Sequence, residues 1–254
     1  MRAILILLAS LGLAALIGVA TAQVPTTHAG LPAPPSSGGG GPIAFVAGGD
    51  LTNNGGSTSS LSGFYSVSTG TNEGLVVCIT GDTLGGADDI TSVTYNSISA
   101  TLLTKYSGAA FTGGDRYQYI YYIPLGNTSA GSHTATITAS STHYILSVVG
   151  EYSKIQQTTT ADATANRAVG GSSDTIPITT STSTSGDWVM LCEQSSIVVT
   201  STGSGDVLRI ATATFANPTL FDSNGTVPVG ANNFGINAAG GASIVTAAAA
   251  LKPG

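Results

Sequence analysis

The segment DDITSVTYNSISATLLTKY, residues 88–106, decides the fold class, because its apolar residues alternate with Ser and Thr. In an extended chain Val93 and Tyr95 point to one side and Thr94 to the other. The alternation breaks at Asn96-Ser97, where a two-residue hairpin loop fits, since Asn tolerates the positive φ of such turns. After the break, the apolar residues again share one face: Ile98, Ala100 and Leu102. The segment predicts a hairpin with an apolar face packed inward and a hydroxylated face that needs no function to exist.

The same pattern extends over the chain from Pro42 onward. Short apolar runs alternate with turn residues at intervals of about ten residues, which is typical of a β-sandwich or barrel. No stretch in this region has a capped helical stripe, and we expect even the Ala-rich ASIVTAAAAL, residues 242–251, to be a strand. We therefore predict one all-β domain over residues 42–254, an antiparallel β-sandwich of jelly-roll or immunoglobulin-like type.

The composition fits such a surface and excludes one class of partner. Only 8% of the 254 residues are charged, whereas roughly a quarter are charged in soluble domains. Hydroxyl groups and backbone therefore carry most of the polarity. The net charge is −6 and the seven Lys and Arg residues are scattered. Nucleic-acid binding requires clustered basic residues, so we expect no nucleic-acid partner.

The N-terminus indicates export. Arg2 precedes an apolar run from Ala3 to Val19, and Ala20-Thr21-Ala22 matches a cleavage site, so residues 1–22 are predicted to be a signal peptide. The alternative is a retained membrane anchor, although the run is short for a span. Residues 23–41, QVPTTHAGLPAPPSSGGGG, have the composition of a flexible, disordered linker. We expect a secreted or cell-surface protein with no membrane span in its mature form.

The order of strands and turns resembles a known module. The runs GLVVCIT, ITSVTYNSISATLL, YQYIYYIPLGNTSAGSHTATITAS, ILSVVGEYSKIQQ and SGDWVMLCEQ are similar to a β-sandwich module common in phage structural proteins and bacterial exported surface proteins. The likeness covers about residues 63–254. Ser97 stands where that module usually has Gly, and two strands carry Cys in place of apolar residues. The resemblance implies a structural or adhesive role, in a virion or on a cell surface.

Two cysteines, Cys78 and Cys192, lie in separate predicted strands. In an exported protein they are candidates for a disulfide. Cys192 shares a face with Trp188 and Met190, whereas Cys78 lies opposite the more apolar side of its strand. The strand faces therefore leave two alternatives open, a disulfide or two buried free thiols.

Three groups of side chains are candidates for binding or chemistry. Tyr117, Tyr119 and Tyr121 share one face of a strand and would form a platform for sugar rings if exposed; otherwise they fill the core. Asp82, Asp88 and Asp89 surround two glycines and offer a weak Ca²⁺ site. Glu151 and Glu193 are the acids nearest to a glycosidase pair, although nothing in their spacing requires one.

These patterns favour a function that is not enzymatic. We expect an exported or virion-associated structural and adhesion protein that presents a rigid sheet to a glycan, to a cell-surface partner, or to copies of itself in an oligomer or fibre. The first alternative is a carbohydrate-binding module that uses the tyrosine row. A less favoured alternative is a glycosidase or lyase on a jelly-roll scaffold.

Overall fold

Strands make up nearly all of the regular structure in the computed structural model, and the residues that it describes contain no helix. The described residues are 42–52, 57–83, 90–111, 114–170, 173–180, 186–195, 201–202, 206–211, 218–237 and 243–254. All of them belong to one unit, residues 35–254. The expected signal peptide, residues 1–22, and the expected linker, residues 23–41, lie outside them.

The largest sheet, called here the eight-stranded sheet, is antiparallel throughout. Its strands are β1 (Ala44–Thr52), β2 (Ser57–Val67), β3 (Gly70–Thr83), β4 (Ile90–Tyr95), β5 (Ile98–Ser99), β6 (Thr101–Phe111), β7 (Gly114–Thr128) and β8 (Gly131–Ser153). Their order is β5-β4-β8-β3-β7-β6, with β1 and β2 also paired to β8. These segments are rich in Val, Ile, Thr and Tyr, the residues that pack well on a pleated surface.

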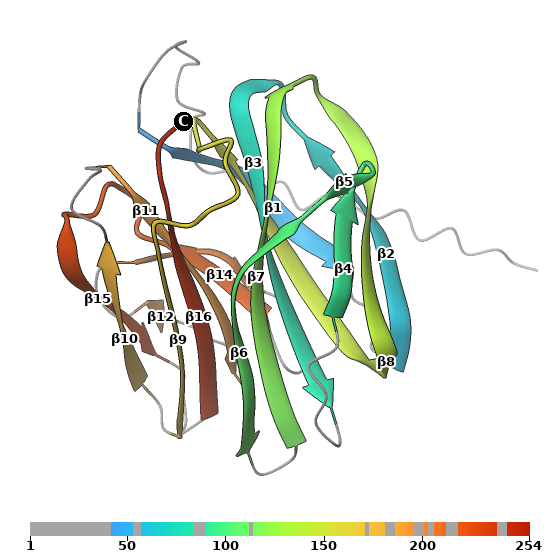
Figure 1. Cartoon of the computed structure of the whole chain (residues 1–254), viewed down its shortest axis with the longest axis vertical. Helices are drawn as coiled ribbons and strands as arrows, with labels where there is room; N and C mark the ends of the chain where they lie inside the picture. The colour runs from blue at the N-terminus through green and yellow to red at the C-terminus, as the bar shows by residue number, and fades with distance from the viewer. Residues whose placement is uncertain are drawn as a thin grey trace, which may run out of the picture. The chain divides into compact units, whose positions relative to one another are not determined.

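Two smaller antiparallel sheets follow in the second half of the chain (Figure 1). The five-stranded sheet has the order β13-β14-β11-β16-β9, and the three-stranded sheet has the order β10-β15-β12. Their strands are β9 (Ala163–Gly170), β10 (Ser173–Thr180), β11 (Trp188–Ser195), β12 (Ser201–Thr202), β13 (Val207–Ala211), β14 (Pro218–Asp222), β15 (Gly230–Asn237) and β16 (Ser243–Leu251). The Ala-rich segment is therefore a strand, as predicted.

Strand β8 is 23 residues long and runs through both parts of the eight-stranded sheet, the part that contains β2 and β4 and the part that contains β1 and β3. Its first half lies between β2 and β4, and its second half lies between β1 and β3 (Figure 1). The first core contains residues from both halves, among them Leu61, Tyr95, Tyr119, Ile137 and Val149. The sheet thus folds over on itself and encloses this core.

Two further cores separate the remaining layers. The second core joins β3, β7 and β8 to β11, β14 and β16, through residues such as Val76, Tyr122, Met190 and Leu220. The third core joins the five-stranded sheet to the three-stranded sheet. The predicted all-β antiparallel sandwich is confirmed, and it contains three cores that alternate with the sheets.

The predicted hairpin forms between β4 and β5. Asn96 and Ser97 both have positive φ, +48° and +65°, which is the backbone of a type I′ turn. Val93 and Tyr95 are buried in the first core, as predicted. Ile98 and Leu102, by contrast, are 39% and 37% exposed. Ile98 lies on β5 and Leu102 on β6, the two strands at the ends of the sheet order, where a side chain has a strand neighbour on one side only.

Candidate functional site

The tyrosine row predicted as a sugar platform lies inside the protein. Tyr117, Tyr119 and Tyr121 are 4%, 2% and 6% exposed and line the first core. Their rings follow one another at centroid distances of 6.3 and 6.2 Å. Strand β7 lies between β3 and β6, and both of its faces are covered by a core. The hypothesis that this row binds a ligand is therefore wrong, because a buried ring cannot stack on a sugar.

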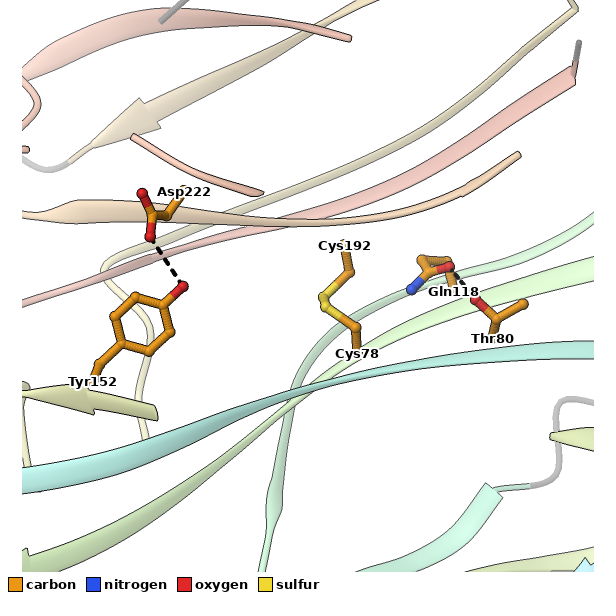
Figure 2. The surroundings of a disulfide bond; sticks show 6 residues. All are labelled: Cys78, Thr80, Gln118, Tyr152, Cys192 and Asp222. Atoms are coloured by element: carbon orange, nitrogen blue, oxygen red, sulfur yellow. Dashed lines mark hydrogen bonds between the residues drawn. A yellow bond between two sulfur atoms is a disulfide. The ribbon is translucent and has the colours of Figure 1, made fainter. Parts of the chain in front are cut away.

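Cys78 and Cys192 form a disulfide between two sheets. Their Cα atoms are 5.4 Å apart, and both side chains lie in the second core. Figure 2 shows the bond joining β3 to β11. Within the same layer, the Thr80 hydroxyl donates to the Gln118 side chain at 2.8 Å, and the Tyr152 hydroxyl donates to Asp222 at 3.1 Å (Figure 2). The disulfide thus fixes the contact between the two larger sheets.

Of the three predicted Ca²⁺ ligands, the structure describes only the backbone of Asp82. Asp88 and Asp89 lie outside the described residues. Asp82 has a backbone in β3, paired with Arg116 and Tyr144, and its side chain is not described. Within the part of the chain that is described, no group of three or more His, Cys, Asp or Glu residues is placed to hold a metal ion.

The acids considered for a glycosidase pair lie in the interior. Glu151 and Glu193 are both fully buried. By strand alternation Glu151 shares the face of Val149 in the first core, and Glu193 shares the face of Leu191 in the third. The second core and the two sheet layers on either side of it separate the two faces. These two acids therefore do not form a pair across a cleft.

A different acid, Glu73, lies near Glu151 in a buried polar cluster. Glu151 accepts hydrogen bonds from the Ser68 backbone N–H at 2.8 Å and from its hydroxyl at 3.5 Å. Burial raises the pKa of Glu73 to about 7, and the charge of Glu151 adds to this shift. Burial also raises the pKa of Glu151, against the effect of the Ser68 hydrogen bonds. With Glu73 only 2% exposed, the cluster has little access to a substrate.

The surface of the eight-stranded sheet offers a better candidate, called here the hydroxyl face. It consists of the outward residues of β2, β4 and the first half of β8: Ser60, Ser62, Phe64, Ser66, Ser92, Thr94, Ser132, Thr134, Thr136 and Thr138. Their pairing places them in rows across the strands, such as Ser62, Thr136 and Thr94. The Ser62 and Thr136 hydroxyls are 3.0 Å apart and hydrogen-bonded. Neighbouring strands lie about 4.8 Å apart and successive outward residues about 6.7 Å apart, so the hydroxyls form a regular array.

One end of this face is hollowed. The hollow, called here the Phe64 groove, has a volume of about 340 Å³ and is lined by Phe64, Thr94, Asn96, Ser97, Ser132, His133, Thr134 and Thr136. Phe64 is 75% exposed. Sequence reasoning missed this residue, although the alternation was visible. Leu61, Tyr65 and Val67 share one face of their segment, which places Phe64 outward among serines.

Comparisons with known proteins add no family. No protein-family model, no curated protein and no solved structure matches the chain. In the described residues there is also no helix with the length and hydrophobicity that a bilayer span requires.

Proposed function

We propose that the protein is an exported structural and adhesion module that is not an enzyme. It acts by presenting the hydroxyl face, held on a rigid scaffold, to an uncharged surface outside the cell or on a virion. The observation that carries this proposal is the face itself, in which three adjacent strands display hydroxyl groups in register.

The scaffold supports a mechanical role. The second core, with the Cys78–Cys192 disulfide inside it, resists separation of the two larger sheets. Disulfides persist in oxidising compartments, which agrees with the signal sequence predicted for residues 1–22. The face is built on strands rather than loops, so its groups keep fixed spacings when a partner approaches.

The chemistry of the face favours a neutral partner. The ten outward residues that define this face include no Asp, Glu, Lys or Arg. Covering them would therefore desolvate no ionised group, which is the most costly kind of desolvation. Ser and Thr hydroxyls both donate and accept hydrogen bonds, so the face can match a partner rich in hydroxyl groups.

Co-sedimentation tests this function. The purified disulfide-bonded protein is mixed with suspended cellulose, chitin and fixed bacterial cells, and the bound fraction and any released soluble sugar are measured. We expect retention on at least one material without sugar release. Thr138→Lys, which places a charge on the hydroxyl face outside the Phe64 groove, should weaken retention by roughly tenfold or more.

Thr179→Lys is the matched control, because Thr179 is exposed on β10 of the three-stranded sheet. It adds the same charge to another surface and should leave retention unchanged. A protein that binds none of the three materials, or that releases sugar from them, would overturn the proposal.

A further inference from the structure

Phe64 is the most exposed of the large apolar side chains described, at 75%. The other outward positions of β2 from residue 60 onward are Ser60, Ser62 and Ser66. A single exposed apolar residue is common on proteins. This one, however, lies in a hollow whose other lining residues are all polar. The groove thus combines one aromatic face, which can cover an apolar part of a ligand, with polar groups that can fix the orientation of that ligand.

The row that contains Phe64 differs from the next row along the strands. Ser62 and Thr136 face each other and are hydrogen-bonded. Thr134 faces Phe64 instead, and an aromatic ring offers its hydroxyl no comparable partner. The Thr134 hydroxyl makes no hydrogen bond to the described part of the chain. The groove thus has a hydroxyl group free to bond a ligand that lies on the ring.

The β4–β5 turn forms the other side of the groove. The Asn96 backbone N–H donates to the Thr134 carbonyl at 3.0 Å, which fixes the turn beside β8. The Asn96 and Ser97 side chains are both exposed and bond no described residue. From the Phe64 strand to the Asn96 strand the distance is about 10 Å, or two strand spacings. This span accommodates a ligand of more than one six-membered ring.

We propose that the Phe64 groove binds a neutral oligosaccharide. The apolar face of one sugar ring lies on the Phe64 ring, while the Asn96 amide and the Thr134 hydroxyl bond the hydroxyl groups of the sugars. The lining contains no Asp, Glu, Lys or Arg, and His133 is its one ionisable residue. The groove therefore complements an uncharged ligand better than a phosphate or an acidic sugar, which Arg or Lys would bind by charge-assisted hydrogen bonds. This inference rests on the proposed adhesive function and assigns it a ligand class and a site.

The test uses a printed array of neutral and anionic oligosaccharides, probed with the full disulfide-bonded protein. Titration calorimetry then gives the affinity for the neutral probe with the strongest signal. We expect binding to neutral probes, weakened by roughly tenfold in Phe64→Ser, the size expected for losing an aromatic stacking contact. Ser is already the residue at the other outward positions of β2, so this variant should fold.

Asn96→Gly is a second variant that keeps the turn, because Gly adopts the required positive φ. It should also weaken binding. Tyr144→Ser is the matched control, since Tyr144 is 48% exposed and does not line the groove. Its affinity should equal that of the wild type.

Three outcomes would overturn the inference: no binding to any neutral probe, binding to anionic probes alone, or affinity unchanged in both groove variants. A loss of self-association in Phe64→Ser, measured by analytical ultracentrifugation without any change in sugar affinity, would assign the groove to a second copy and would also overturn it. The co-sedimentation test separates the two proposals. If Thr138→Lys weakens retention and Phe64→Ser does not, the sugar site in the groove is refuted and the adhesive function stands. If the wild-type protein is not retained at all, the adhesive function itself is refuted.

Discussion

Breaking the Cys78–Cys192 disulfide should remove a large part of the stability of the fold. The bond joins residues 114 positions apart. In the chain-entropy model, a loop of this length stabilises the folded state by about 5 kcal/mol, because the cross-link restricts the unfolded chain. Typical domains are stable by only about 5–15 kcal/mol. The double substitution Cys78→Ala/Cys192→Ala should therefore leave a protein close to the limit of folding.

Urea unfolding followed by tryptophan fluorescence measures this effect. Trp188 lies on β11 and packs in the second core beside the disulfide layer, so its emission reports separation of the two sheets. With a urea dependence of about 2–3 kcal/mol per molar, a loss of about 5 kcal/mol lowers the midpoint by roughly 2 M.

Wild-type protein refolded in a reducing agent is the control. Its thiols fill nearly the same space, so its stability isolates the cross-link from the small voids that the alanines leave. Thiol titration under denaturing conditions establishes the oxidation state of each sample. Equal midpoints for oxidised and reduced wild type would refute the reasoning, since the cross-link would then contribute nothing.

Four further predictions follow from the fold. Burial raises the pKa of Glu73 and Asp187 to about 7 and that of Asp206 to about 6. Above pH 5 the folded protein therefore binds more protons than the unfolded chain. The free energy of unfolding should consequently fall as the pH rises from 5 to 8. Urea midpoints across this range check the sign, and a midpoint that rises would contradict it. Ser97→Gly should stabilise the fold by about 0.5–1 kcal/mol, since Gly adopts the positive φ at that turn position without strain; a lower melting temperature would count against the type I′ turn. Tyr119→Ala should destabilise by about 3–5 kcal/mol, measured by urea unfolding, whereas an exposed Tyr119 would give almost no change. Retention on neutral surfaces should vary little between low and high salt, because ion pairs contribute nothing to it, and a steep loss with salt would indicate a charged contact.

Local features of this fold could be predicted from sequence. The Asn96-Ser97 turn, the burial of Val93 and Tyr95, and the strand at residues 243–251 all follow from short-range alternation and turn preferences. The length of β8 could not be predicted in this way. Two separate runs, SHTATITAS and HYILSVVGEY, are joined in one 23-residue strand, because its two halves pair with different neighbours.

The number of layers could not be predicted, because alternation shows that a strand has two faces and not what covers each one. For Cys78, the side with fewer apolar residues faces the second core, where the partner Cys192 lies. The prediction that the tyrosine row binds a ligand was wrong for the same reason. Strand β7 is covered on both sides, so neither of its aromatic faces reaches solvent. Only the packing of a second sheet, set by residues far away in the sequence, decides these points.

The hydroxyl side of the opening hairpin is also explained by packing. Thr favours strands and Ser pairs with it across them, as in the Ser62–Thr136 bond, so most of the face is accounted for by sheet stability alone. Short side chains have little rotamer entropy to lose when a partner covers them, whereas Lys or Glu would lose about 1.5–2 kcal/mol each. Covering a face of this kind therefore costs little side-chain entropy, but the face by itself gives only weak affinity for a partner. Specific binding requires a feature that the array does not supply, and Phe64, which interrupts the hydroxyl pairing at Thr134, is such a feature in the described part of the sheet.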